Sequence, residues 1–144
     1  MPELRVVPSQ PSGIQVVETF LAALKAVDID GALALLSDDI EYQNVPFAPD
    51  RGKARVERTL RAFLRFAPEF DVRMHNIAER DGVVLTERTD ILRGPLVDLE
   101  FWVCGTFELR GGQIAVWRDR FDLGGFLFQL ATSPVRRVLR SFTR

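Results

Sequence analysis

Apolar residues recur at helical spacing through most of the first half of the chain. The spacing predicts a helix that begins at Ser12, a short helix that begins at Asp30 and a third helix over residues 56–64. Ser12 and Gln15 stand three residues apart, as in a capping box, which supports the first of these starts. Ile40, Tyr42 and Asn44 stand at every second position, so they would share one face of an extended chain. This period of two predicts a strand over residues 40–44.

The second half of the chain changes to a period of two. The pattern predicts four strands, over residues 70–76, 83–93, 99–109 and 113–122. Asp81-Gly82 and Gly111-Gly112 indicate tight turns between neighbouring strands. Helices followed by an antiparallel meander are typical of an α+β fold. We expect a curved, mixed or antiparallel sheet that wraps around the N-terminal helices and forms a cone with a deep pocket.

The length fits a single domain over residues 1–144. Residues 1–11 carry three prolines and no periodicity, so they are expected to form an extended arm, and residues 12–123 are expected to form the cone. Residues 124–144 are expected to be a basic helical segment, in which Ser133-Pro134 indicates a helix start. Its apolar stripe favours docking on the body of the protein or on a partner subunit. The alternative is contact with an anionic membrane surface through Arg136, Arg137, Arg140 and Arg144.

Composition narrows the function classes. A net charge of −1 argues against a general nucleic-acid binder. Cys104 and His75 are the only residues of their types, so a disulfide framework, a Cys-based metal site and a multi-histidine metal site are excluded. No secretory signal and no stretch of transmembrane length is visible, so a cytoplasmic location is expected. Asp98, Glu100 and Asp122 are expected to be surface charges.

Polar residues stand on strand faces that are otherwise apolar. Arg88 and Asp90 share a face of one predicted strand, Asp119 lies on another strand, and Tyr42 and Asn44 share a face of a third. Charges turned toward a core are costly unless they are paired. If these faces line the cone, Arg88 can bridge Asp90 and Asp119.

Two carboxylates that share one arginine suit acid–base chemistry on a water molecule. Nearby like charges cannot both ionise cheaply in a pocket of low dielectric constant, so one carboxylate stays charged while the other holds a proton. Such a pair titrates as a coupled unit. Tyr42 and Asn44 could hold a water molecule against the charged carboxylate. From the residues alone, a purely structural buried ion network remains the alternative.

Three segments resemble the signature segments of the limonene-1,2-epoxide hydrolases. They are Tyr42-Gln43-Asn44-Val45-Pro46, Glu87-Arg88-Thr89-Asp90-Ile91-Leu92 and Trp117-Arg118-Asp119-Arg120-Phe121-Asp122. The resemblance extends over roughly residues 14–123 and keeps the order of the segments. It implies an NTF2-like cone, commonly dimeric, that acts without a metal ion or a cofactor.

The same resemblance implies a role for each polar residue. Asp119 would be the general base, and Tyr42 and Asn44 would share the water that it activates. Asp90 would be the general acid on the epoxide oxygen, and Arg88 would bridge the two carboxylates. The product would be a vicinal diol that forms in one step, without a covalent enzyme ester.

The expected substrate is a small lipophilic epoxide, such as a terpenoid, fatty-acid or sterol epoxide, and detoxification is an expected role. Leu92, Trp117 and Phe121 are expected to contact it. One alternative is an NTF2-like isomerase or cyclase, but proton shuttling with a carboxylate needs no water-holding pair. Another is a non-catalytic module for apolar-ligand binding or dimerisation, which does not require an arginine between two aspartates.

The strand over residues 99–109 carries apolar side chains on both faces. Phe101, Val103 and Phe107 lie on one face, and Trp102 and Cys104 lie on the other. Only one face can line the cone, and a second apolar face on a protein needs cover. A homodimer with an isologous contact between sheet faces, with support from the C-terminal helix, is therefore expected.

Overall fold

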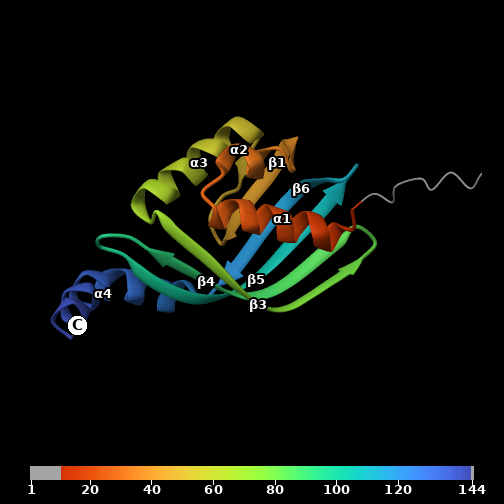
Figure 1. Ribbon diagram of the computed structural model, residues 1–144. Coiled ribbons are helices and arrows are strands. Elements are labelled where there is room, and N and C mark those ends of the chain that lie inside the picture. Colours follow the sequence, from red (N-terminus) through yellow and green to blue (C-terminus); the bar gives the residue numbers. More distant parts are fainter. Residues whose placement is uncertain (1–10, 144) are drawn as a thin grey trace, which may run out of the picture.

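The computed structural model describes residues 11–143, in which a mixed sheet of six strands curves around helices (Figure 1). The strands are β1 (Leu36–Val45), β2 (Asp50–Arg51), β3 (Glu69–Arg80), β4 (Val83–Arg93), β5 (Asp98–Arg110) and β6 (Gln113–Phe121). The helices are α1 (Gly13–Lys25), α2 (Ile29–Leu33), α3 (Lys53–Phe66) and α4 (Leu123–Phe142). The strand order is β2-β1-β6-β5-β4-β3. The predicted α+β fold is confirmed, while most of the expected N-terminal arm and Arg144 lie outside the described residues.

The first helix begins where its capping box predicts. The backbone N–H of Gln15 donates to Ser12 Oγ over 3.2 Å, and the backbone N–H of Ser12 donates to Gln15 Oε1 over 2.9 Å. The carboxylate of Glu79 on β3 accepts from the N–H groups of Gly13 and Ile14. Because these donors have no partner within the helix, a carboxylate there satisfies them and also complements the helix dipole. The contact ties α1 to the sheet.

Two tight turns fix the register of the antiparallel strands. Asp81 and Gly82 have φ angles of 52° and 76°, and Gly111 and Gly112 have φ angles of 58° and 78°. Positive φ at both central residues is the conformation of a type I′ hairpin turn, which glycine adopts without steric cost. Both predicted turns are confirmed. They join β3 to β4 and β5 to β6, whereas β1 joins the sheet parallel to β6.

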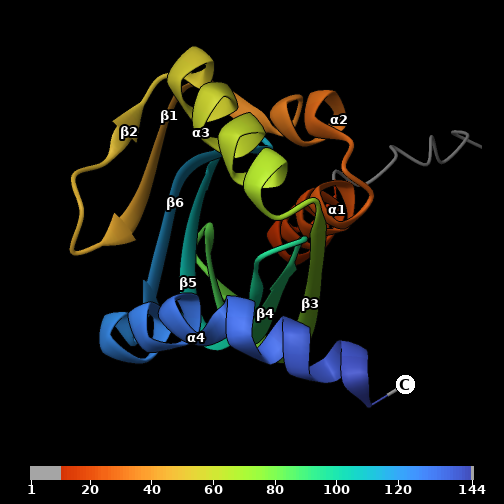
Figure 2. The same cartoon turned by 90° about the vertical axis from the view of Figure 1, so that its left-hand side faces the viewer.

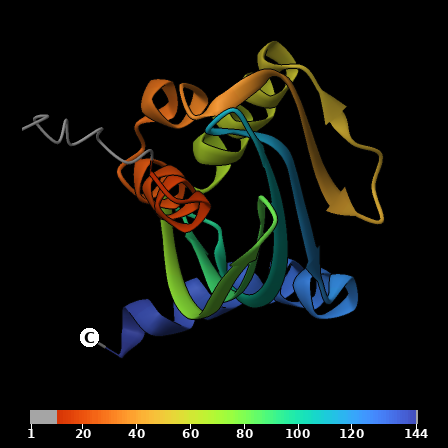
Figure 3. The ribbon, with the colours of Figure 1, turned by 90° about the vertical axis from the view of Figure 1, so that its right-hand side faces the viewer.

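A core of aromatic and aliphatic side chains fills one end of the concave face. Phe20 of α1 is fully buried, with its ring centroid 4.9 Å from that of Trp117 and 6.4 Å from that of Phe107. Such edge-to-face pairs are worth about 0.5–1.5 kcal/mol beyond their buried area. Helix α1 packs against β3, β4 and β6, and Figure 3 shows it close to end-on beside β3. This packing leaves the opposite ends of β4, β5 and β6 free to line a cavity.

Helix α4 begins earlier than its local signal predicts. It runs from Leu123 to Phe142 and contains Pro134, so the predicted start at Ser133-Pro134 is wrong. Ser133 is instead fully buried, and its hydroxyl contacts the backbone of Asp98 and Gln129. The first turns of α4 pack Phe126 and Leu130 against a second apolar cluster. This packing starts the helix directly after β6 and outweighs the local preference of proline for a first helical turn.

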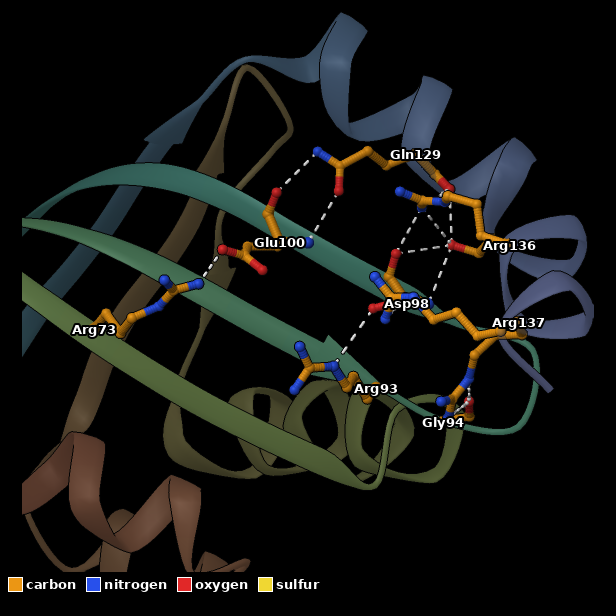
Figure 4. A network of polar contacts seen from close by, with 10 residues as sticks. Arg73, Arg93, Gly94, Asp98, Glu100, Gln129, Arg136 and Arg137 are labelled. Atoms are coloured by element: carbon orange, nitrogen blue, oxygen red, sulfur yellow. Dashed lines mark hydrogen bonds and ion pairs between the residues drawn. The ribbon is translucent and has the colours of Figure 1, made fainter. Parts of the chain in front are cut away.

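Polar contacts hold α4 against the start of β5 (Figure 4). Gln129 forms two hydrogen bonds with the backbone of Glu100, each 2.9 Å long, and Arg136 donates to the carbonyl of Asp98 over 2.7 Å. The carboxylate of Asp98 is buried beneath α4 and lies 2.6 Å from Arg140. The expectation that Asp98 is a surface charge is therefore wrong, because a helix and its arginines cover this strand end. Glu100 and Asp122 are exposed, as expected.

The apolar stripe of α4 faces away from the body of the protein. Its exposed members have between 52% and 81% of their surface accessible: Leu127, Phe128, Val135, Val138, Leu139 and Phe142. Arg136 and Arg137 instead face the body and donate to the carbonyl groups of Asp98 and Gly94. The first alternative, docking of the stripe on the body, is therefore wrong, and docking on a partner subunit stays a prediction. No helix among the described residues is long and apolar enough to cross a membrane.

Candidate active site

The three polar segments predicted from the sequence meet on the concave face of the sheet. Because β1 pairs with β6 in parallel, Asn44 lies beside Asp119 and Tyr42 lies beside Trp117. Strand β5 separates β6 from β4. Arg88 of β4 reaches across β5 to Asp119, which brings residues from three strands into contact.

Arg88 bridges the two carboxylates, as the strand faces predicted. Its Nε donates to Asp90 Oδ1 over 2.8 Å, and its Nη2 donates to Asp90 Oδ2 over 3.2 Å and to Asp119 Oδ2 over 2.8 Å. The arginine is fully buried, and both aspartates are nearly so. Its Nη1 donates to Thr86 Oγ1 over 2.9 Å. Arginine suits this position because its planar fork of donors can serve two carboxylates at once.

Tyr42 and Asn44 form a second polar pair next to Asp119. The side-chain amide of Asn44 donates to the hydroxyl of Tyr42 over 2.7 Å. The ring of Tyr42 stacks on Trp117 with 3.9 Å between centroids, which holds the hydroxyl in place. The alternation of β1 therefore puts two neutral polar groups beside one carboxylate.

A cavity of about 230 Å³ opens onto these polar groups. Asp90, Asp119, Tyr42 and Asn44 line it, together with the predicted contact residues Leu92, Trp117 and Phe121. The sequence pattern missed further wall residues: Phe47, Phe63, Phe101 and Phe126. Helices α3 and α4 lie toward opposite ends of β5 and β6 in Figure 2, and they supply Phe63 and Phe126. The cavity wall is therefore largely apolar, from aromatic and aliphatic side chains, with polar groups in one part of it.

Burial and charge shift the protonation of the polar groups. Burial raises the pKa of the Asp90 carboxyl to about 6, although the neighbouring Arg88 guanidinium acts in the opposite direction. Burial and the charge of Asp119 raise the pKa of the Tyr42 hydroxyl, so Tyr42 remains a neutral donor. Burial alone would lower the pKa of Arg88, but Asp119 and Asp90 outweigh it and raise that pKa. Arg88 is therefore charged at any physiological pH.

The raised pKa of Asp90 predicts that the free energy of unfolding depends on pH. The folded protein binds this proton more tightly than the unfolded chain, whose Asp pKa is near 3.8. The resulting stabilisation is present below pH 3.8 and is lost as the pH rises through about 6. Relative to an Asp90→Asn variant, the wild type should lose about 2–3 kcal/mol of unfolding free energy between about pH 4 and about pH 8. Urea denaturation of both proteins across this range measures the difference.

Asp71→Asn provides a control of opposite sign. The hydrogen bond from Lys25 lowers the pKa of Asp71, so this carboxylate stabilises the fold once it is ionised. The wild type should therefore gain stability relative to Asp71→Asn as the pH rises. A stability difference between wild type and Asp90→Asn that stays flat across the pH range would show that Asp90 titrates alike in the folded and unfolded states.

Comparison with known proteins identifies the family. The model of the limonene-1,2-epoxide hydrolase catalytic domain matches residues 11–132. The chain is 45% identical over 108 residues to epoxide hydrolase EphG of Mycobacterium tuberculosis (strain ATCC 25618 / H37Rv), which covers 74% of this chain and 71% of EphG. The solved structure of an M. tuberculosis LEH-like epoxide hydrolase has a TM-score of 0.80 and 40% identity, over 89% of this chain and 96% of that chain.

A more distant likeness concerns the fold alone. An NTF2-like protein from Cytophaga hutchinsonii ATCC 33406 has a TM-score of 0.70 at 19% identity, over 85% of this chain and 99% of that chain. The curved sheet and its helices thus form an NTF2-like fold. The chain belongs to the limonene-1,2-epoxide hydrolase family and is an epoxide hydrolase.

Proposed function

We propose that this enzyme adds water to a lipophilic epoxide in one step, with Asp119 as the general base and Asp90 as the general acid. The observation that carries the proposal is the position of Arg88, which joins two buried carboxylates in the wall of an aromatic-lined cavity. Because one arginine holds both carboxylates, the base can take a proton from the water while the acid donates a proton to the epoxide oxygen in the same step. Among residues 11–143, no group of three or more His, Cys, Asp or Glu side chains could hold a metal ion.

Activation of the water falls to Asp119 and its neighbours. Asp119 Oδ2 accepts a hydrogen bond from Arg88, whereas Asp119 Oδ1 is buried and receives no hydrogen bond from the described residues. Asn44 donates to Tyr42, which leaves Asn44 Oδ1 as an acceptor and the Tyr42 O–H as a donor for a water molecule. This pair would orient the water while Asp119 takes its proton.

Opening of the epoxide ring falls to Asp90. As the water oxygen bonds to an epoxide carbon, the C–O bond of that carbon breaks and the Asp90 O–H donates its proton to the leaving oxygen. The product is a vicinal diol, and no enzyme ester forms. A carboxyl group with a pKa of about 6 is protonated often enough near neutral pH to act as this acid. The proton gained by Asp119 must return to Asp90 before the next cycle, and Arg88 holds both carboxylates during this exchange.

The cavity wall supports a lipophilic substrate. Phe47, Phe63, Phe101 and Phe126 surround it, and none of these side chains can hydrogen-bond a polar substituent. A ligand that enters such a site gains mainly from burial of its apolar surface. Terpenoid and fatty-acid epoxides of a size that fits about 230 Å³ are therefore the proposed class.

Single-turnover hydrolysis in ¹⁸O-labelled water tests the proposal. Excess enzyme is mixed with a lipophilic epoxide such as limonene-1,2-epoxide, and the diol is analysed by mass spectrometry. One-step addition puts the label into the diol of the first turnover. A mechanism through an aspartyl ester would instead transfer an unlabelled enzyme oxygen in that turnover.

The same experiment separates the alternative functions. An isomerase or cyclase would convert its substrate without taking up oxygen from water. A binding module would retain the epoxide unchanged. Either result, over a panel of epoxides of graded size, would contradict the proposed hydrolysis.

We also propose that the protein forms a homodimer through the outer, convex face of the sheet. Trp102 of β5 is 51% exposed on this face, and Leu85 of β4 is also 51% exposed. Phe107 and Val103, on the other face of β5, are buried in the core. Exposed aromatic and aliphatic side chains on one sheet face favour a self-complementary contact.

Trp102→Glu should convert the dimer to a monomer, because a charge in an apolar contact must be desolvated. Light scattering at micromolar concentration measures the mass. Phe66→Glu, at the exposed end of α3, is the matched control and should leave the dimer intact. A wild-type monomer, or a dimer broken by Phe66→Glu and not by Trp102→Glu, would rule out this interface.

A further inference from the structure

One row of neighbouring residues crosses the sheet directly beneath the Arg88 guanidinium. Strand pairing puts Thr86 beside Gly105, Gly105 beside Asp119, and Asp119 beside Asn44. Thr86, Asp119 and Asn44 are polar, whereas the second residue of the row has no side chain. Arg88 itself lies two residues beyond Thr86 on β4, so its side chain reaches the row diagonally.

Gly105 provides the space that the guanidinium occupies. A Cβ atom at this position would lie 2.3 Å from Arg88 Nη1, 2.7 Å from Thr86 Oγ1 and 2.9 Å from Asp119 Oδ1. Gly105 does not have a positive φ angle, so its backbone conformation does not require glycine. A glycine within a strand otherwise weakens the strand, and a close approach by another group is one reason for its presence.

Thr86 provides the acceptor for the side of the guanidinium that faces away from the carboxylates. Its hydroxyl is buried and receives the Nη1–H of Arg88 over 2.9 Å. Nε and Nη2 donate to Asp90 and Asp119. Because the guanidinium is planar and rigid, an acceptor for Nη1 fixes the direction in which Nε and Nη2 point. Without it, a charged donor would be buried and unpaired.

We propose that Thr86 and Gly105 are positioning residues, which together hold the Arg88 guanidinium in the one orientation that serves both carboxylates. Neither residue lines the cavity or touches the reacting atoms. Their effect passes through Arg88 to Asp90 and Asp119. The inference rests on the proposed roles of these two carboxylates as acid and base.

The proposal predicts a change in proton affinity as well as in rate. The titratable groups that face Arg88 are Asp90 on its own strand, Asp119 on β6 and Tyr42 on β1. If the guanidinium turns away, the Asp90 carboxyl loses part of the cation that lowers its pKa, so the pKa of Asp90 should rise further. The acid then stays protonated to a higher pH. The alkaline limb of the profile of kcat/KM against pH, where the acid loses its proton, should therefore move to higher pH.

Three threonine variants test this inference. Thr86→Val keeps the shape of the side chain but removes the acceptor, and we expect it to lower kcat/KM by about 10- to 100-fold and to move the alkaline limb of the pH profile to higher pH. Thr86→Ser keeps the hydroxyl and should retain both the rate and the profile of the wild type. Thr89→Val makes the same substitution on the outer face of β4, where the hydroxyl contacts exposed His75, and should change neither. Carbon-13 NMR titration of the Asp90 carboxyl follows its pKa independently of turnover.

The outcomes separate positioning from packing. Equal loss of activity in Thr86→Val and Thr86→Ser, or a wild-type pH profile in Thr86→Val, would overturn the proposal. Gly105→Ala displaces the same guanidinium from another direction and should also raise the pKa of Asp90 in the NMR titration. If the wild type hydrolysed no epoxide, the proposed function would fail, yet the NMR titrations would still show whether Thr86 and Gly105 orient Arg88.

Discussion

Asp119→Asn should lower the rate of epoxide hydrolysis by about 10²–10⁴-fold, the typical contribution of a general base. An amide cannot accept the proton of the attacking water at neutral pH. The variant should still fold, because an Asn side chain has nearly the same shape and its carbonyl oxygen can accept from Arg88 Nη2 in place of Asp119 Oδ2. Single-turnover formation of the diol, measured by mass spectrometry, gives the loss in the chemical step.

The same substitution should also change the acid. The charge of Asp119 is one cause of the raised pKa of Asp90, so its removal should lower that pKa and leave less of the acid protonated near neutral pH. Asp122→Asn is the matched control, since Asp122 is exposed three residues further along the chain and should be replaceable without loss. Near-wild-type turnover in Asp119→Asn would remove Asp119 from the role of base.

Local pattern was sufficient to predict the polar centre of the site. Alternation on β4 put Arg88 and Asp90 on one face, and alternation on β1 did the same for Tyr42 and Asn44. A buried arginine must find a partner, so its contact with Asp119 could be predicted before the order of the strands was known. The contact with Thr86 could not, because it depends on the direction in which the guanidinium crosses β5. Gly105 within a strand was the available signal of that close approach.

The further residues of the cavity wall and the start of α4 could not be predicted from local sequence patterns, for a different reason. Phe47 follows β1 in a loop, Phe63 comes from α3 and Phe126 comes from α4, so only tertiary packing brings them together. The burial of Asp98 depends on the same packing, because Ser133 and Arg140 come from a helix more than thirty residues later in the chain. Local signals at Ser133-Pro134 therefore predicted the wrong helix start, while the turns at Gly82 and Gly112, which depend only on backbone conformation, were predicted correctly.

Arg88→Met should destabilise the fold more than any other single substitution in the site. Removal of one partner from a buried ion pair costs about 3–5 kcal/mol, because the remaining charges are left without compensation. Arg88 is fully buried and serves Asp90 and Asp119 together. The loss should be smaller at acid pH, because protonation of the two carboxylates removes the uncompensated charge. Urea denaturation at about pH 5 and about pH 8 measures this difference.

Two further variants show whether the loss comes from charge or from packing. Arg88→Met combined with Asp90→Asn and Asp119→Asn removes all three charges and should recover most of the lost stability, because a neutral network leaves no charge unpaired. Arg73→Met removes an exposed arginine whose partner is Glu100 on the outer face of the sheet, and such a pair contributes little to stability. If the triple variant were as unstable as Arg88→Met alone at both pH values, the arginine would be needed to fill the core. If the triple variant is stable but inactive, the buried charges serve the chemistry at a cost to the fold.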